Sequence, residues 1–217
     1  MTDRASFLAA VRSTPRGADP GLPDRLQVPG APTELRAGED PVARLAAECE
    51  ANSTVVHRVA TSAVDATIVS ILVGAGAKTV AVTADLGERV ADLRTAVADA
   101  GIEVGDYSDV APDRPRAGAL DATVTGCVAA IAATGSIITA AAGAGRAGAL
   151  IAPTHVCVVE RGQIVSGLHE LFDGEVLGDV GSLFALQSGP SRSADIEKVL
   201  ILGVHGPGNV HLVIVDD

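Results

Sequence analysis

The sequence has almost no aromatic residues. Tryptophan is absent, and Phe, Tyr and Trp together make up 2% of the 217 residues. Proteins that hold single-stranded nucleic acids stack the bases on aromatic side chains, so this composition argues against that class of function. Because 47% of the residues are nevertheless hydrophobic, the core must be built from Val, Leu, Ile and Ala.

Positive charge is also scarce. The chain has 16 Lys and Arg residues against 27 Asp and Glu, for a net charge of -11, and its only lysines are Lys78 and Lys198. Such a chain repels phosphate backbones, which excludes nucleic acid as the main ligand. A local anion pocket is still compatible with this charge, because backbone N–H groups bind phosphate or carboxylate.

Cysteine is rare and unpaired in the sequence. Cys49, Cys127 and Cys157 include no C-x-x-C pair, which argues against a disulfide framework and against an iron–sulfur cluster bound by this chain. We therefore expect reduced, buried thiols and no intrinsic cofactor. No H-E-x-x-H or similar spacing occurs, so we predict no metal site.

Long hydrophobic segments are missing as well. No apolar run reaches the roughly 18 residues that a membrane span needs, and the residues after Met1 lack the charged and apolar regions of a signal peptide. We therefore expect a cytoplasmic protein that does not enter the membrane.

The length fits one domain with an N-terminal extension. Residues 1–40 are expected to hold a helix over residues 2–13 and then a Pro/Gly-rich linker with prolines at positions 15, 20, 23, 29 and 32. The domain itself is expected over residues 41–217, where a helix resumes at residues 41–51.

Strands and helices alternate from residue 53 onward. Apolar runs predict strands at residues 54–60, 79–83 and 102–107, and helical periodicity predicts helices at residues 62–73 and 86–100. A second block contains predicted strands at residues 122–125, 136–141, 155–160, 183–187 and 210–215, and a helix at residues 193–201. This rhythm predicts an α/β fold with a mainly parallel sheet covered on both faces.

The segment from Ser188 to Glu197 is the strongest local signal. A strand runs into a Gly-Pro turn, and Ser193 is a natural N-cap for the following helix. We expect Gly189, Ser191 and Ser193 to supply hydrogen-bond donors and Arg192 to supply positive charge to a small anion. Such loops lie at the carboxyl ends of parallel strands, where ligands bind.

Asp195 and Glu197 are candidate catalytic acids in the same segment. Two residues apart on a helix, they face different directions, so only one can point into a site, and Asp195 is nearer the loop. The alternative is a plain helix start, in which both acids simply complement the helix dipole.

His205 is a further catalytic candidate, in a Gly/Pro turn after the predicted helix. A helix of about nine residues spans about 13 Å, so His205 meets the Ser191 loop only if the turn folds back or a neighbouring subunit supplies it. The alternative is a solvated turn residue.

Residues 143–148 form a literal G-x-G-x-x-G after a strand, with Glu160 at the end of the next strand. Pro153 follows so soon that little helix fits between, which argues against a nicotinamide or flavin site. We expect instead an anion-wrapping loop with Arg146 as its charge.

Thr134 and Gly135 precede a strand, and His155 opens the next strand after Pro153. These residues are ligand-binding candidates if their strand edges line the cleft. The alternatives are a structural glycine turn and, for His155 and His211, ordinary hydrogen-bonded strand residues.

These motifs, in this order, resemble the LUD-domain family, in its lactate-utilisation protein C type. The resemblance runs from about Pro41 to the C-terminus and is most specific over residues 188–207. It implies a three-layer α/β/α fold similar to the sugar-phosphate isomerases and coenzyme A transferases. It also implies membership of a three-protein system that oxidises L-lactate to pyruvate, with the iron–sulfur clusters in partner proteins.

One position departs from the family pattern. The family commonly reads A-E-T-G where this chain has Ala133 before Thr134 and Gly135. The missing carboxylate argues against independent catalysis that depends on it. Three functions stay open: a lactate-oxidation subunit that binds a small carboxylate or phosphate-bearing ligand, an autonomous isomerase or transferase using Asp195, Glu197 or Glu160, and a non-catalytic scaffold.

Overall fold

A computed structural model of the chain describes residues 3–4, 6, 9, 35–36, 38–140, 145–173, 176–177, 183–194, 200–203 and 206–217, without the side chains of residues 145–147, 173, 193–194 and 200–202. The chain divides into two units, Met1–Ala31 and Pro32–Asp217. In the first unit Arg4, Ser6 and Ala9 are helical, as the helix predicted over residues 2–13 requires. The predicted linker lies outside the described residues, apart from residues 35–36 and 38–40.

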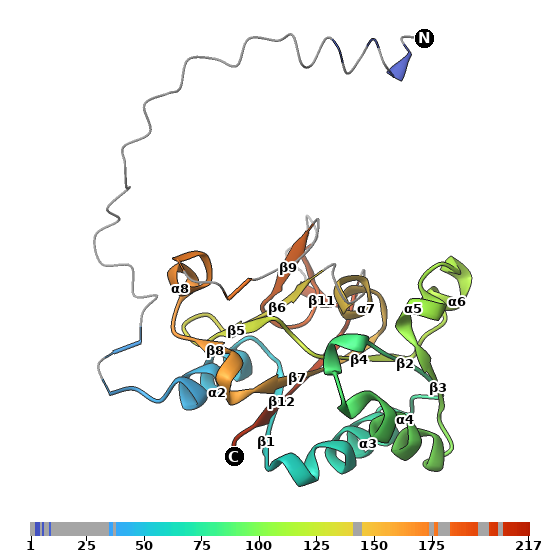
Figure 1. The fold of residues 1–217 in the computed structure, drawn as a ribbon, viewed down its shortest axis with the longest axis horizontal. Helices are drawn as coiled ribbons and strands as arrows, with labels where there is room; N and C mark the ends of the chain where they lie inside the picture. The colour runs from blue at the N-terminus through green and yellow to red at the C-terminus, as the bar shows by residue number, and fades with distance from the viewer. Residues whose placement is uncertain are drawn as a thin grey trace. The chain divides into compact units, whose positions relative to one another are not determined.

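The second unit is built on a parallel sheet of six strands (Figure 1). In spatial order these are β1 (Val55–Val59), β12 (Asn209–Val215), β7 (Thr154–Glu160), β4 (Ala122–Thr125), β2 (Thr79–Val82) and β3 (Glu103–Asp106). Every neighbouring pair in this sheet is parallel. The central strands are rich in valine and are buried along almost their whole length, as expected for a sheet covered on both faces.

Helices cover one face of the six-stranded sheet. They are α3 (Val64–Gly74), which follows a 3-10 turn at Thr61–Ala63, and α4 (Arg89–Asp99), which follows another at Ala84–Leu86. Ile68, Leu72, Leu93 and Val97 from these helices pack on Val124, Val156 and Val213 of the sheet. The predicted α/β class with a mainly parallel sheet is therefore confirmed.

The other face carries helices and a second sheet. The helices are α2 (Pro41–Ala51), α5 (Tyr107–Val110), α6 (Arg114–Gly118) and α7 (Gly145–Ile151). The second sheet has four strands in the order β8 (Ile164–Val165), β5 (Ala129–Ile131), β6 (Ser136–Ala140) and β9 (Phe184–Gln187). A 3-10 turn at Arg161–Gln163 precedes β8, and α8 (Leu168–Asp173) follows it.

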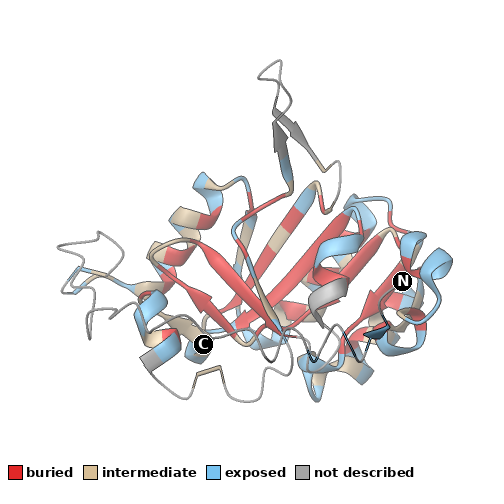
Figure 2. Cartoon of the chain, turned by 90° about the horizontal axis from the view of Figure 1, so that it is seen from above, coloured by how far each residue is buried: buried red, intermediate tan, exposed pale blue. Residues whose placement is uncertain are grey.

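The two sheets share a core with α2. Ile137 of β6 belongs to the same buried cluster as Leu45 of α2 and as Cys157 and Leu212 of the six-stranded sheet. Figure 2 shows the buried strands of both sheets lying beneath the more exposed helices. The strands predicted at residues 136–141 and 183–187 thus form a separate layer, in which β6 pairs antiparallel with both β5 and β9.

Residues 192–194 and 200–202 form paired strands where the sequence predicted a helix. Strand β10 (Arg192–Ala194) pairs antiparallel with β11 (Leu200–Leu202), and Arg192 lies opposite Leu202. The helix predicted over residues 193–201, with Ser193 as its N-cap, is therefore wrong. An isolated helix of about nine residues is marginal, and pairing with the apolar segment Leu200–Leu202 outweighs the local capping signal.

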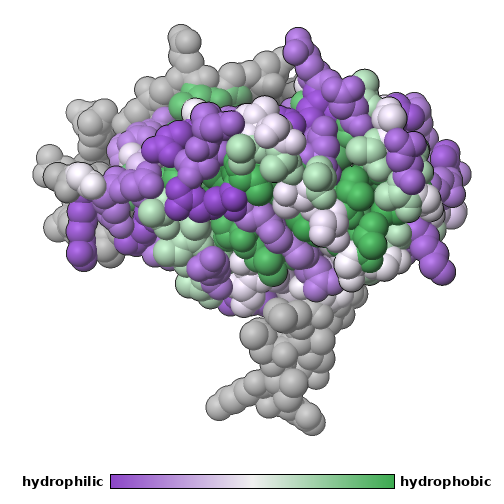
Figure 3. All heavy atoms as spheres, turned by 90° about the horizontal axis from the view of Figure 1, so that it is seen from below, coloured by the Kyte–Doolittle hydropathy of each residue, from purple (hydrophilic) through white to green (hydrophobic). Residues whose placement is uncertain are grey.

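The surface alternates polar and apolar groups on the face drawn in Figure 3. In keeping with this, α4 buries Leu93 and Val97 and leaves Arg94, Asp99 and other polar residues at least partly exposed. Among the described residues, no helix is long and apolar enough to cross a membrane.

Candidate functional site

Three turns meet at the end of helix α2, and we call this arrangement the turn cluster. Its parts are Asn52 and Ser53 after α2, residues 134–136, residues 188–192, and Gly203 with Gly206 and Pro207. The Asn52 side-chain amide donates to the Thr134 carbonyl at 3.2 Å. Ser191 N–H donates to the Pro207 carbonyl, and Gly203 N–H donates to the Ser191 carbonyl, each at 2.9 Å. Segments far apart in sequence are thereby fixed together.

The turn cluster lies at the amino edge of the six-stranded sheet, the edge at which its parallel strands begin. Helix α2 leads into β1, and the backbone N–H groups of Gly208 and Asn209 donate to the Pro153 carbonyl, just ahead of β7. The sequence placed residues 188–192 at the carboxyl ends of parallel strands, and this was wrong. The reason is that β9, which leads into them, belongs to the antiparallel layer.

Two predicted ligand-binding glycines have a structural role in this cluster. Gly135 (φ 61°) and Gly189 (φ 93°) both adopt backbone conformations that L side chains rarely take. A Cβ on Gly135 would lie 2.7 Å from the backbone nitrogen of Cys49, and one on Gly189 would collide with the carbonyl oxygen of Asn52. Only glycine lets both turns lie directly on the end of α2.

A chain of hydroxyl groups joins two of the turns. The Thr134 Oγ1 lies 2.8 Å from the Ser136 Oγ, and the Ser136 Oγ lies 2.6 Å from the Ser188 Oγ. Ser136 is buried, Thr134 is half-buried and Ser188 is exposed. Hydrogen bonds in such a chain polarise one another, so an anion beside Ser188 would meet a strengthened donor.

Arg192 lies at the exposed end of the turn cluster. Its Nη2 donates to the Asn52 carbonyl at 2.7 Å and to the Ser53 hydroxyl at 3.3 Å. The guanidinium therefore caps the carboxyl end of α2, where a cation is favoured by the helix dipole. Both bonds use Nη2, and the other guanidinium nitrogens make no hydrogen bond to a described residue, so they are available to an anion.

Because β10 and β11 pair with each other, the first described residues that follow β11 lie close to Ser191. Gly203 and Gly206 return to Ser191, and a Cβ on Gly206 would be 3.2 Å from the Ser191 Cβ. Gly203 and Gly206, on either side of residues 204–205, thus lie near the loop that contains Ser191. His205, Asp195 and Glu197 themselves lie outside the described residues, as does the side chain of Ser193, so their proposed roles stay predictions.

His155 lies between the two sheets in a buried group of polar side chains. Its Nε2 is 2.9 Å from the Thr125 Oγ1, and the residue is fully buried. Burial lowers the pKa of the imidazole to about 4, while a side-chain interaction with Gln187 opposes that shift. The ring is therefore neutral near pH 7.

Three buried polar atoms in this region have no hydrogen-bond partner. They are His155 Nδ1, Gln187 Oε1 and Thr139 Oγ1. Gln187 and Thr139 lie on the same face of the four-stranded sheet as Ile137, which packs against the six-stranded sheet. The Gln187 side chain acts to raise the pKa of His155, yet His155 Nδ1 and Gln187 Oε1 have no hydrogen bond of good geometry. These atoms are therefore available to hydrogen-bond a further small molecule. His211, by contrast, is satisfied by His57, at 3.2 Å between Nδ1 and Nε2.

The glycine motif at residues 143–148 opens helix α7, which has seven residues. The strand before it, β6, is in the four-stranded sheet, and the strand after it, β7, is in the other sheet. A dinucleotide fingerprint needs both strands in one parallel sheet, which agrees with the prediction against it. Gly148 has a packing role, because its carbonyl accepts from Thr123 at 2.8 Å. The side chain of Arg146 is outside the described set.

Glu160, the alternative base, lies at the opposite edge of the sheet from the turn cluster, where β7 ends. Its side chain is half exposed and faces Arg89 at 3.7 Å, and it forms a capping box with Gln163 at the following 3-10 turn. These contacts give Glu160 a structural role.

The three cysteines are buried, and none forms a disulfide, as expected. All belong to the core cluster between the sheets. Burial raises the pKa of Cys49 to about 12, and a hydrogen bond with Cys157 together with burial raises that of Cys127. Thiolates are the metal-binding form of cysteine, and the described residues include no group of three or more metal-ligating side chains.

Several members of the site were missed in the sequence. Asn52, Ser136 and Ser188 were not named as site residues, nor were Thr125, Thr139 and Gln187. A usable signal exists for two of them, because Thr139 and Gln187 are polar residues inside otherwise apolar strands, and buried polar groups need partners.

Comparison with known proteins identifies the family of the chain. Residues 42–215 match the LUD domain. The chain belongs to the LUD-domain family. Ala133 lies in the turn between β5 and β6 and donates its N–H to the Ser166 carbonyl at 3.1 Å.

Two relatives share part of the chain. Lactate utilization protein C of Deinococcus radiodurans is 40% identical over 99 residues, covering 44% of this chain and 46% of the relative. Lactate utilization protein C of Bacillus licheniformis is 33% identical over 81 residues, covering 34% of this chain and 32% of the relative. Each match thus spans less than half the length of the relative.

The fold is also similar to a solved structure. The crystal structure of a DUF162 family protein from Deinococcus radiodurans at 1.70 Å resolution superposes with a TM-score of 0.60 at 23% identity, covering 81% of this chain and 96% of that one. At this identity, the likeness shows the fold alone.

Proposed function

We propose that this chain serves lactate utilisation by binding a small 2-hydroxy or 2-oxo carboxylate at the turn cluster. The observation that carries the proposal is the hydroxyl chain from Thr134 through Ser136 to Ser188, in the same turn cluster as the Arg192 guanidinium. In a chain of net charge -11, an anion needs a local concentration of donors and positive charge of this kind. The relatives named lactate utilization protein C support the choice of carboxylate.

The reaction served would be oxidation of L-lactate to pyruvate, which releases two electrons and two protons. We propose that the electrons pass to iron–sulfur clusters in partner proteins, since the buried thiols of this chain do not fit a cluster. We further propose that the chain is an accessory or catalytic subunit of this system and works in the cytoplasm.

Deleting the gene and measuring growth on L-lactate tests the role. Growth should be lost and should return with the wild-type gene, whereas complementation by a Ser136→Ala, Ser188→Ala double variant should restore it only weakly. Ser108→Ala, an exposed hydroxyl on α5, is the matched control and should complement fully. Normal growth of the deletion strain, with no second lactate oxidase present, would contradict the proposal.

Titrating the purified chain with L-lactate and pyruvate separates binding from assembly. We expect binding of either acid that weakens by roughly tenfold or more in the double variant, from the loss of charge-assisted hydrogen bonds. Turnover of phosphorylated sugars or acyl-coenzyme A by the chain alone would favour the isomerase or transferase alternative. Co-purification with partners, unaffected by the variant, would favour a scaffold.

A further inference from the structure

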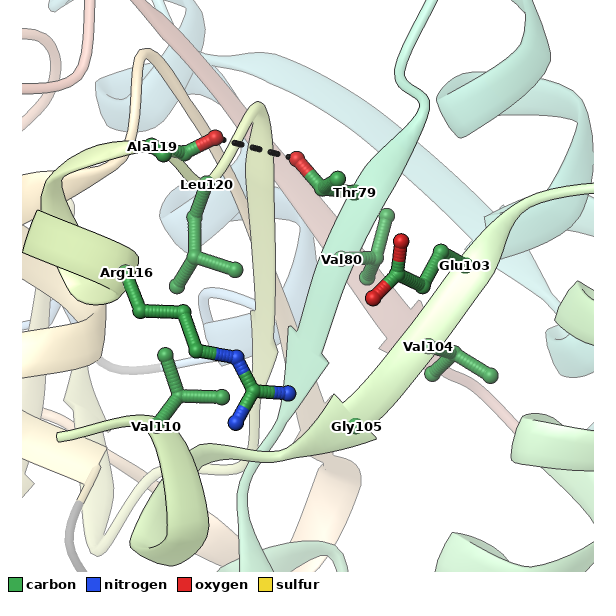
Figure 4. A pocket seen from close by; sticks show the side chains of 9 residues that line it. All are labelled: Thr79, Val80, Glu103, Val104, Gly105, Val110, Arg116, Ala119 and Leu120. Atoms are coloured by element: carbon green, nitrogen blue, oxygen red, sulfur yellow. Dashed lines mark hydrogen bonds between the residues drawn. The ribbon is translucent and has the colours of Figure 1, made fainter. Parts of the chain in front are cut away.

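A second cavity lies away from the turn cluster, under helices α5 and α6. It has a volume of about 90 Å³ and is bordered by strands β2 and β3 (Figure 4). Its lining residues are Thr79, Val80, Glu103, Val104, Gly105, Val110, Arg116, Ala119 and Leu120. None of these residues belongs to the proposed lactate site, so an occupant here would be a separate ligand.

The cavity exists because the strand that borders it has a glycine, Gly105, and therefore no side chain at this point. Gly105 of β3 pairs with Ala81 of β2, and a Cβ on Gly105 would have Val110 of α5 at 3.8 Å as its nearest neighbour. That distance is ordinary van der Waals contact, and the Gly105 φ angle is not in the left-handed range. Neither space nor backbone conformation therefore requires glycine at this position. Its effect is to leave space between the sheet and the two helices.

The cavity carries opposite charges. Figure 4 shows the Arg116 side chain extending from α6 toward β3, and the Glu103 carboxylate reaching the cavity from β3 itself. Among the described residues neither side chain takes part in a salt bridge, with the other or with any third residue. Both residues are exposed to solvent, and the cavity mouth thus carries one cation and one anion that are free to contact an occupant.

The remaining lining fixes the polarity of an occupant. Val110 and Leu120 are aliphatic and buried, and the Thr79 hydroxyl is already bonded to the Ala119 carbonyl and to Asp121. The charged groups are thus the main polar contacts on offer. An occupant must pair with both charges and place a small apolar group on the aliphatic wall.

We propose that this cavity binds a small aliphatic α-amino acid. Its carboxylate would accept hydrogen bonds from the Arg116 guanidinium, which matches a carboxylate in a bidentate manner, and its ammonium group would donate to Glu103. The volume is far below the several hundred Å³ of pockets for drug-sized ligands, which excludes nucleotides and peptides. A 2-hydroxy acid has no cation for Glu103, so lactate should be rejected here.

Isothermal titration of the full-length chain with L-alanine, glycine and L-lactate tests the proposal. We expect L-alanine to bind and both Arg116→Gln and Glu103→Gln to weaken it by roughly 10- to 100-fold, the range for hydrogen bonds to charged groups. Arg114→Gln and Glu50→Gln are matched controls outside the cavity lining and should leave the affinity unchanged. Thermal melts of all variants establish that they are folded.

Gly105→Val gives an independent check. It fills the cavity without a strained backbone, so it should abolish L-alanine binding while the melting temperature changes little. Absence of L-alanine binding at millimolar concentration would overturn the proposal, as would equal effects of Arg116→Gln and Arg114→Gln. A different outcome is that L-lactate binds as tightly as L-alanine and is unaffected by Glu103→Gln. That result would show that the site recognises only a carboxylate, and it would also overturn the proposal of an amino-acid ligand.

Discussion

The hydroxyl oxygen of Ser136 lies 2.6 Å from that of Ser188, although the two residues are 52 positions apart. One begins strand β6 and the other follows strand β9, its antiparallel neighbour. This contact joins the buried Ser136 to the exposed Ser188, and so connects the interior between the sheets to the surface of the turn cluster.

Ser136→Ala should therefore separate function from stability. The loss of one hydroxyl from a chain whose neighbours can reach water should cost about 0.5–1.5 kcal/mol of unfolding free energy. Binding of L-lactate should fall more than this, because Ser188 loses its polarising neighbour. Urea unfolding and calorimetric titration measure the two effects, and Ser136→Thr, which restores the hydroxyl, should recover binding. Equal losses in stability and binding would indicate a purely structural hydroxyl.

Stability should fall in acid through His155. Its pKa is about 4 in the folded chain against an ordinary value of 6.5, so the unfolded chain takes up the proton first as the pH decreases. Stability is thus retained above about pH 6.5 and is lost progressively toward pH 4, by about 2 kcal/mol at pH 5 for this group. Urea unfolding of wild type and His155→Gln across this range measures the difference. The same acid sensitivity in both proteins would disprove this assignment.

Gly135→Ala and Gly189→Ala should each destabilise the domain by more than about 2 kcal/mol. Each alanine would combine an unfavourable backbone conformation with a collision against the backbone at the end of α2. Gly162→Ala is the control, since nothing lies within 4 Å of its Cβ position and its φ is not in the left-handed range. Thermal denaturation compares the three, and a Gly189→Ala melt as high as that of Gly162→Ala would contradict the packing described.

Arg192→Ala should lower both stability and anion binding. Loss of the bonds to Asn52 and Ser53 should cost about 0.5–1.5 kcal/mol, and loss of the charge should weaken L-lactate binding by roughly one to two decades. Arg192→Lys should restore the α2 cap better than it restores binding, because an ammonium group lacks the planar fork. If melt and binding are unchanged, the anion site lies elsewhere, and Arg146 becomes the next candidate.

The purified chain should carry neither an iron–sulfur cluster nor tightly bound flavin. Cys49 and Cys127 have raised pKa values in a buried core, which disfavours thiolate ligands, and the glycine motif at residues 143–148 opens only a short helix. A visible absorption spectrum of protein purified without oxygen decides this. Stoichiometric bands of either chromophore would overturn it.

The parallel sheet was predictable from sequence because its signal is local. Apolar runs separated by amphipathic helices specify βα units, and helix α2 was placed at residues 41–51, as observed. The pairing of β10 with β11 was not predictable in this way. Ser193 followed by acidic residues is the usual pattern of a helix N-terminus, and it therefore predicted a helix instead. Arg192 faces Leu202 in the observed pairing, and the helical pattern of the intervening residues gives no signal of it.

Only part of the candidate site was predicted, because sequence patterns describe residues that are close together in the chain. Thr134, Gly135, Gly189, Ser191 and Arg192 were each named, but their common meeting point was not. Asn52 connects them through its side chain to Thr134 and through its carbonyl to Arg192, across separations of 82 and 140 residues. Sequence patterns find residue types suited to a role, whereas partners at such distances are set by the topology of both sheets.

The order of strands has a consequence for synthesis. Strand β12 follows every other described strand in sequence, yet it lies between β1 and β7 and pairs with both. While the chain emerges from the ribosome, β1 has no partner in this sheet until β12 appears. The gap between β1 and β7 must therefore stay open through most of translation, and a nascent chain interrupted before residue 209 would leave two valine-rich strand edges available to chaperones or to aggregation.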